Sequence, residues 1–348
     1  MESVSFLFIT FVSKQKKSQI MKKYMWAGII LAATMLVSCG GLQTFTFDQL
    51  HPAEVTFPEQ VRTIAVVNHA PSIPSPKKNL LTLGKLEGDG KVLAETLAGG
   101  LADSRYFNQV IISDSVLTQE RTGGELIPQA VVDSLTQVLG ADMILSVDQI
   151  QLLTAKKEIY YPGFVPLAAF DLKIRPVVRA YVPSRLMPVM TLAKVDSLLW
   201  DFTPALSDYN VVNEASNHAA YTLVNQLVPH WGNADRIYFD GGNPDMRDAA
   251  VSLREGDWQE AGRIWTNLYN SLKKGKMKSR AAFNMALACE VQGQMEDANS
   301  WIEKARKSAS PESEEERAAT FYAAILQDRT KDFLKLNLQM RRFGNNFN

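Results

Sequence analysis

Cysteine and histidine are scarce in this sequence, which has two cysteines, Cys39 and Cys289, and four histidines among 348 residues. No two histidines have the i, i+4 spacing of a helical metal-binding pair, and neither a Gly-x-Ser-x-Gly elbow nor a phosphate-binding Gly-x-x-x-x-Gly-Lys loop occurs. The sequence therefore predicts no metal site, no cofactor and no catalytic residue. We expect the protein not to be an enzyme.

Neither sign of charge is in excess, because 37 lysines and arginines balance 37 aspartates and glutamates. A nucleic-acid-binding protein normally carries a basic surplus, so we expect no nucleic-acid partner. Hydrophobic residues make up 46% of the chain and charged residues 21%, which is enough for a packed core. The length favours about two domains.

The N-terminal region has the pattern of an export signal. Residues 26–37 form an apolar run that is too short to span a bilayer and has the length of a signal-peptide core. Met21 is a better start than Met1, because Lys22 and Lys23 then form the basic segment in front of this run. Residues 1–38 are therefore interpreted as a signal peptide, with residues 1–20 upstream of the true start.

The apolar run ends in Leu-Val-Ser-Cys-Gly at residues 36–40, which resembles a lipobox. The resemblance implies cleavage before Cys39, a diacylglyceryl thioether on its thiol and acylation of the new N-terminus. An ordinary signal peptide or an uncleaved anchor is the alternative. A multiply acylated cysteine is a stable membrane anchor, and it leaves Cys289 without a partner for a disulfide. Because no acidic residue follows at 40–44, we expect the outer membrane, facing the periplasm.

The first half of the mature chain predicts an α+β domain at residues 61–232, behind a lipidated tether at 39–60. β-branched runs, alternation and helical periodicity give the order β-α-β-α-β-β-β-α, with a mixed sheet. Gly88-Asp89-Gly90 is read as a turn and helix N-cap rather than a phosphate site. The expected strands are 61–68, 110–113, 141–153, 170–182 and 189–202, and the expected helices are 90–103, 128–139 and 214–228.

Three segments of this half resemble the group that includes the TolB N-terminal domain, the lipoprotein activator LpoB and the curli secretion lipoprotein CsgG. They are the first strand at 64–67, the second at 106–112 and the Leu-Gly-Ala-Asp-Met-Ile-Leu segment at 139–145. The likeness covers about half of the chain. It implies a fold and fixes no function.

The second half resembles degenerate tetratricopeptide repeats. A glycine and an alanine recur 37 residues apart, close to the 34-residue period of that family with a short insertion. Residues 245–344 are therefore expected to form an all-α repeat domain, with a capping third helix pair at 314–327 and 331–343. The residues expected to pack the repeats are Gly256, Trp258, Ala261, Trp265, Gly293, Ala298, Ile302 and Ala305.

Taken whole, the chain resembles an uncharacterised family of bacterial lipoproteins in which a domain of unknown function precedes such repeats. We therefore expect a cell-envelope interaction or assembly protein, tethered to the membrane by Cys39, whose partner is another envelope protein or itself. An oligomeric secretion-channel subunit of the CsgG type and a cryptic cell-wall or carbohydrate hydrolase are the alternatives. Whether the repeat groove is free or filled by the first domain stays open.

Overall fold

A computed structural model describes residues 41–78, 80–113, 124–160, 162–163, 165–201 and 206–343. Cys39 and the expected signal peptide at residues 1–38 lie outside the described residues. The chain divides into two compact units, which are described separately. The helical unit combines the residues up to Asp48 with Asn233–Lys331, and the α+β unit combines Gln49–Gly232 with Asp332–Asn348. None of the helices in the described ranges is long and apolar enough to cross a membrane.

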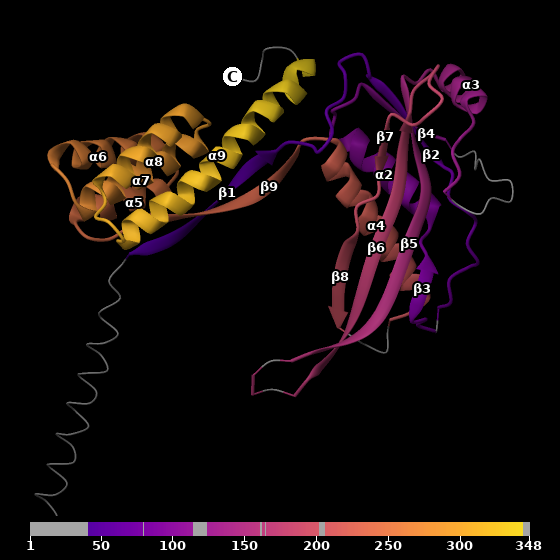
Figure 1. Ribbon diagram of the computed structural model, residues 1–348, viewed down its shortest axis with the longest axis horizontal. Coiled ribbons are helices and arrows are strands. Elements are labelled where there is room, and N and C mark those ends of the chain that lie inside the picture. Colours follow the sequence, from indigo (N-terminus) through magenta and orange to yellow (C-terminus); the bar gives the residue numbers. More distant parts are fainter. Residues whose placement is uncertain are drawn as a thin grey trace, which may run out of the picture. The chain divides into compact units, whose positions relative to one another are not determined.

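The α+β unit is built on a mixed sheet, with the strand order β4-β2-β5-β6-β7 (Figure 1). Strand β3 pairs with the second half of β5, and β8 pairs with the first half of β6. The strands β4, β2 and β5 are parallel, whereas β5 and β6 form a long antiparallel hairpin. The strands are β2 (Thr63–Asn68), β3 (Gly84–Glu87), β4 (Gln109–Ser113), β5 (Met143–Ile159), β6 (Leu167–Tyr181), β7 (Met190–Leu192) and β8 (Asp196–Asp201).

Two helices cover one face of this sheet, and one helix covers part of the other (Figure 1). Helices α2 (Gly90–Asp103) and α4 (Asp208–Leu227) pack against the larger apolar core. Helix α3 (Gln129–Leu139) covers a smaller apolar cluster on the opposite face. Consecutive parallel strands need such crossovers, because the chain leaves one strand at one end of the sheet and must enter the next strand at the opposite end. The predicted α+β class with a mixed sheet is confirmed.

A β-bulge at Asp148 exchanges the two faces of β5. The pairing of β5 with β6 shifts register between Val147 and Gln149. Before the bulge, Leu145 and Val147 point into the larger core, and after it Ile150 and Leu152 do so. An extra residue reverses the two-residue alternation of a strand. The bulge therefore keeps apolar side chains in the core and turns Gln149, Gln151 and Leu153 to the other face.

The sequence located α2 and α3 closely, placed the start of α4 six residues too late, at 214 instead of Asp208, and missed strand β3. Helix α2 has the predicted bounds, and the side chain of Asp89 caps it by accepting hydrogen bonds from the backbone N–H groups of Lys91 and Val92. The single strand predicted at 189–202 is instead two strands, β7 and β8, which pair with different parts of β6. Pro176 lies in β6 between these two pairings, opposite Ile150 of β5.

The helical unit contains two helical hairpins followed by a long helix (Figure 1). Gly256 and Gly293 have positive φ angles of 79° and 76° in the turns that end α5 and α7. Such angles are strained for residues with a Cβ atom, which explains the two glycines. The helices are α5 (Pro244–Arg254), α6 (Trp258–Ser271), α7 (Lys276–Val291), α8 (Met295–Ser308) and α9 (Glu314–Met340).

Two expectations about the ends of the mature chain need correction. The predicted third pair at 314–327 and 331–343 is one continuous helix, α9, followed by a short 3-10 turn at Arg341–Phe343. No glycine or proline stands between residues 327 and 331 to end the helix. Part of the expected tether at 39–60 forms strand β1 (Leu42–His51), which pairs with β9 (His230–Phe239). That partner is distant in the sequence and left no local signal.

Candidate functional site

Most residues that the sequence assigned to repeat packing are buried in the helical unit. Ala261, Trp265, Ala298, Ile302 and Ala305 are all buried. Trp258 is only half-buried, and its ring contacts Phe45 of β1 edge-on, with 5.2 Å between the ring centroids. Gly256 and Gly293 form the turns described above. These residues hold the two hairpins together, and Trp258 also contacts β1.

The end of β9 lies on one face of α7 and is held there as an extended peptide. The side-chain amide of Asn284 accepts a hydrogen bond from the backbone N–H of Phe239 at 2.9 Å and donates one to its carbonyl at 2.7 Å. The Phe239 ring meets Phe283 edge-on at 5.1 Å, and the guanidinium of Arg280 lies 4.6 Å from its centroid. Phe239 is completely buried. This face of α7 is therefore occupied by the chain itself.

A buried ion pair fixes β9 at a second point of the same face. The carboxylate of Glu290 accepts hydrogen bonds from Nε and Nη2 of Arg236 at 2.9 and 2.6 Å, and from the Tyr322 hydroxyl at 2.6 Å. Burial raises the pKa of Tyr322, and the Glu290 charge adds to this effect. Burial alone would lower the pKa of Arg236, but the hydrogen bonds and charge of Glu290 raise it. The pair joins β9, α7 and α9.

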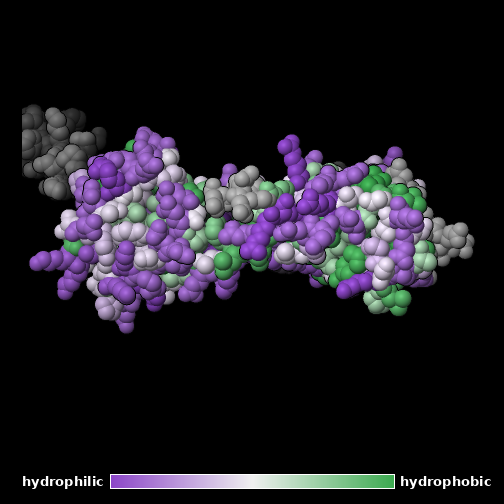
Figure 2. All heavy atoms as spheres, turned by 90° about the horizontal axis from the view of Figure 1, so that it is seen from above, coloured by the Kyte–Doolittle hydropathy of each residue, from purple (hydrophilic) through white to green (hydrophobic). Residues whose placement is uncertain are grey.

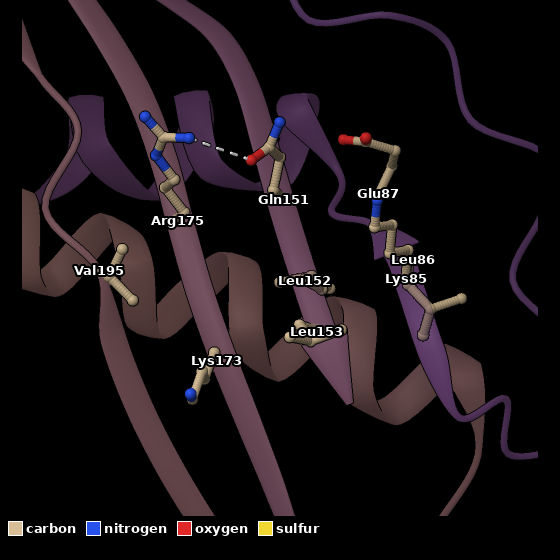
Figure 3. Close-up of a pocket in the computed structure, with 9 residues that line it drawn as sticks. All are labelled: Lys85, Leu86, Glu87, Gln151, Leu152, Leu153, Lys173, Arg175 and Val195. Atoms are coloured by element: carbon tan, nitrogen blue, oxygen red, sulfur yellow. Dashed lines mark hydrogen bonds between the residues drawn. The ribbon is translucent and has the colours of Figure 1, made fainter. Parts of the chain in front are cut away.

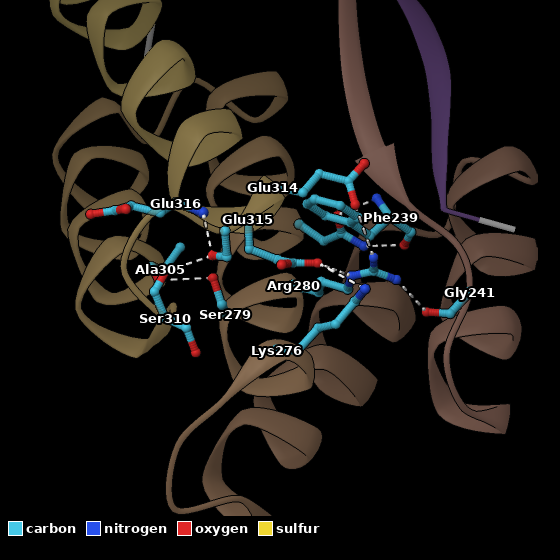
Figure 4. A network of polar contacts seen from close by, with 12 residues as sticks. Phe239, Gly241, Lys276, Ser279, Arg280, Ala305, Ser310, Glu314, Glu315 and Glu316 are labelled. Carbon is cyan, nitrogen blue, oxygen red and sulfur yellow. Dashed lines mark hydrogen bonds and ion pairs between the residues drawn. The ribbon is translucent and has the colours of Figure 1, made fainter. Parts of the chain in front are cut away.

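A third contact ties α7 to the start of α9 (Figure 4). Arg280 donates from Nε to Glu315 at 2.9 Å and from Nη1 to the Gly241 carbonyl at 3.4 Å. Lys276 lies 3.4 Å from the same carboxylate. Burial alone would raise the pKa of Glu315, but hydrogen bonds from its own backbone N–H and from Arg280, with the charges of Arg280 and Lys276, hold the pKa below its usual value of 4.5.

Sequence reasoning missed Arg236, Arg280, Asn284, Glu290 and Tyr322. A signal for three of them was present, because α7 is apolar on nearly every side and its buried residues include four alanines, Phe283 and Leu287. A helix that is apolar all round lies in the centre of its unit, so its few polar residues need buried partners. The partners on β9 and α9 have no such local signal.

The α+β unit has an open face, which is the part of the sheet on the α3 side that α3 leaves uncovered. A cleft of about 450 Å³ lies there (Figure 3). It is lined by Lys85 and Glu87 of β3, Gln151 and Leu153 of β5, and Lys173 and Arg175 of β6. Arg175 donates to the Gln151 amide oxygen at 3.5 Å. Three cations and one carboxylate, Glu87, therefore line the cleft. Burial raises the pKa of Glu87, against the effect of a hydrogen bond from Gln149.

Exposed apolar side chains accompany these charges. Leu153, Val195 and Leu199 are all exposed, on β5, before β8 and on β8. Figure 2 shows a mainly hydrophilic surface on the visible side of the helical unit and more hydrophobic surface on that of the α+β unit. A face with both apolar area and charge is typical of a contact surface rather than of a solvated one.

A buried polar cluster lies on the same face of the sheet, next to the Asp148 bulge. Asp148 accepts hydrogen bonds from the Ser146 hydroxyl and from Arg179, both at 2.5 Å, and its Oδ1 lies 3.1 Å from Nδ1 of His69. The serine donates its only proton to the carboxylate, which is not the serine-to-histidine bond of a nucleophilic triad. His69, which directly follows β2, is buried here and joins the segment after β2 to the sheet.

Within the described residues, no group of three or more His, Cys, Asp or Glu side chains is placed to hold a metal ion. Cys289 is buried and free, and burial raises the pKa of its thiol to about 11. The thiolate is thus a minor species at neutral pH. Cys289 therefore packs as a small buried hydrophobe.

Two families of unknown function match the chain. The domain of unknown function DUF8603 matches residues 61–239, just over half of the chain, and the domain of unknown function DUF6340 matches residues 247–328. These matches agree with the expected resemblance to an uncharacterised family. No curated protein matches the sequence.

Two solved structures illustrate the structural comparison. The PelC dodecamer from Paraburkholderia phytofirmans is 13% identical, with 53% of this chain and 98% of that chain covered and a TM-score of 0.24. The hypothetical protein CT253 from Chlamydia trachomatis is 11% identical, with 48% and 91% covered and a TM-score of 0.25. TM-scores this low carry no argument about this chain.

Proposed function

Because the chain belongs to the family of the domain of unknown function DUF8603, whose description assigns no activity, we propose a function from the features of the chain itself. We propose that the protein is a lipid-anchored protein of the cell envelope, which acts by binding another envelope protein and performs no catalysis. Cys39 carries the lipid, and the mature chain lies on the periplasmic face of the outer membrane. The lipobox pattern at residues 36–40 supports the anchor.

The observation that carries the binding role is the open face of the α+β unit. Its cleft is lined by three cations, Lys85, Lys173 and Arg175, and by one carboxylate, Glu87. Exposed leucines lie on the same face. Apolar area supplies the driving force for association, whereas the charges select the partner and its orientation. We therefore propose that the partner binds this face.

The helical unit supports this function as a scaffold. We read its two hairpins as tetratricopeptide-like, on the 37-residue spacing and the two glycine turns. Repeats of that kind bind peptides in the groove that their helices form. Here the end of β9 occupies the α7 face through Asn284 and Glu290, so an external peptide would have to displace the buried Phe239.

Crosslinking in living cells tests the proposal. The parent chain is compared with a Lys173→Glu/Arg175→Glu variant and with a Lys91→Glu/Lys307→Glu control, which makes the same charge change at exposed positions on α2 and α8 that do not line the cleft. We expect one envelope protein to be captured by the parent and the control and to be reduced at least tenfold with the cleft variant. Equal capture by all three would remove the role of the open face.

The anchor is tested separately, by growth with a labelled fatty acid. Label is expected in the parent and absent from a Cys39→Ser variant, which should leave the membrane fraction. Label in the variant would contradict the assignment of Cys39.

A further inference from the structure

The hairpin of β5 and β6 extends beyond the rest of its sheet (Figure 1). The pairing of β3 with β5 stops at Thr154, and that of β8 with β6 stops at Ala169. Beyond these points, in the described residues, β5 and β6 pair only with each other, to Ile159 opposite Leu167. We call Tyr160, Pro162, Gly163, Val165, Pro166 and Leu167 the hairpin tip.

The hairpin tip presents apolar side chains to solvent. Tyr160 is 71% exposed, Val165 81% and Leu167 57%, and both prolines are exposed as well. A single exposed apolar residue is ordinary, but a cluster at the end of a projecting hairpin marks a contact surface. The prolines also lack the N–H groups by which a further strand would pair, which argues against an added strand here.

Basic residues stand directly behind the apolar tip. Lys156 and Lys157 are exposed, and as successive strand residues they point to opposite faces of the hairpin. Glu158, which follows them, accepts a hydrogen bond from the Tyr160 hydroxyl at 2.6 Å, and Asp171 stands opposite Ala155 on the paired strand. The apolar tip, Tyr160 and the two lysines follow one another along the hairpin. A bilayer presents acyl chains, the interface and anionic headgroups in the same order.

We propose that the hairpin tip docks on the surface of an anionic membrane, with Tyr160, Val165 and Leu167 in the interface and Lys156 and Lys157 at the headgroups. The proposal rests on the proposed lipid anchor only for the membrane that it selects. A chain held at a bilayer by Cys39 meets that surface at high effective concentration, so a small apolar tip is sufficient. The contact would fix the orientation of a unit that the lipid alone leaves free to rotate.

Depth-dependent quenching tests the proposal in the full lipidated chain. A fluorophore is attached at Val165→Cys or, in a second variant, at Leu167→Cys, and Leu186→Cys is the control, because Leu186 is 80% exposed in the loop between β6 and β7. The buried Cys289, with its thiol pKa of about 11, should not react. The proteins are reconstituted into vesicles that contain phosphatidylglycerol and a headgroup-labelled quencher lipid, or into phosphatidylcholine vesicles with the same quencher.

We expect at least twofold stronger quenching at residues 165 and 167 than at 186, and a loss of that excess in phosphatidylcholine or after Lys156→Glu/Lys157→Glu. Absence of quenching at both tip positions would overturn the proposal, and so would equal quenching in the two kinds of vesicle. If Cys39 proves not to be lipidated, the proposed anchor fails. The same labelled chains are then added to preformed vesicles, where the same excess at the tip is required.

Discussion

Glu290 joins three elements of the helical unit, because it pairs with Arg236 and Tyr322 away from water. Two charges in such a place are costly to bury, and their attraction offsets that cost only while both are present. Removing one partner therefore lowers the stability of the unit more than replacing both partners by apolar residues would. The same reasoning applies less strongly to pairs at the surface, where water screens the charges.

We predict that Glu290→Ala lowers the free energy of opening of α7 by about 3–5 kcal/mol, because it leaves the buried Arg236 without its carboxylate. Hydrogen exchange of the α7 amides measures this opening without requiring the whole chain to unfold as one. The control is Glu260→Ala, which removes an exposed pair with Arg263 and should have no measurable effect. Equal protection in the two variants would show that the buried pair contributes nothing.

Glu315 gives the helical unit a dependence on pH. Its pKa is lowered in the folded chain, so it contributes stability that is present above the unfolded value of about 4.5 and is lost as the pH falls through the folded pKa. We predict that parent and Glu315→Gln differ in α9 protection at pH 7 and converge on acidification below pH 4.5. A difference that persists or grows in acid would have the wrong sign for this account.

At the residue scale, the sequence could predict what depends on local conformation. Gly256 and Gly293 were found because a left-handed turn needs glycine at one defined position, and Asp89 because a helix N-terminus needs a side-chain acceptor. Asp148 and Asn284 were not found. Their roles depend on partners far away in the chain, Arg179 and Phe239, which no spacing in a single sequence brings together.

At the scale of elements, helix periodicity predicted α2 and α3 closely, because an amphipathic stripe is written within the helix itself. The strands β1 and β9 were not predicted as a pair, since a ladder between distant segments has no period of its own. The expected last strand is split because β7 and β8 pair with two separate parts of β6, which the composition of the segment does not indicate.

The continuity of α9 is the element on which expectation and structure differ most clearly. We predict that Asp328→Pro destabilises the C-terminal part of this helix by about 3 kcal/mol, because proline removes a hydrogen bond and clashes with the preceding turn. Asp328 is exposed and forms a surface ion pair with Lys331, so Asp328→Ala serves as the control. Circular dichroism would register the lost helix. An unchanged spectrum and stability would instead favour two helices with a break near this position.

At the scale of the whole molecule, the sequence predicted an α+β part and a helical part but not how the chain is shared between them. The helical unit takes its β-ribbon from both ends of the α+β segment, and the α+β unit takes the end of α9. There Gln339 donates to the carbonyls of Ala53 and Val55 and accepts from the N–H of Ala53. Each unit is therefore completed by distant segments, which a division of the sequence into consecutive domains cannot express.

The open face also emerges only at this scale. The charges that line it come from β3, β5 and β6, and the Asp148 bulge decides that the side chains of Gln151 and Leu153 reach it. The sequence placed Lys173 and Arg175 only within the expected strand at 170–182. Their grouping with Lys85 required the fold.

The central claim is that a partner binds this open face, and site-specific photocrosslinking in cells tests it most directly. A photoreactive residue is placed at Leu199, which is 49% exposed on the open face, or at Tyr221, which is 62% exposed on α4 on the opposite side of the sheet. The account predicts one envelope-protein adduct from position 199, its loss with Lys173→Glu/Arg175→Glu, and no adduct from position 221. No adduct at 199, or the same adduct at both positions, would contradict it.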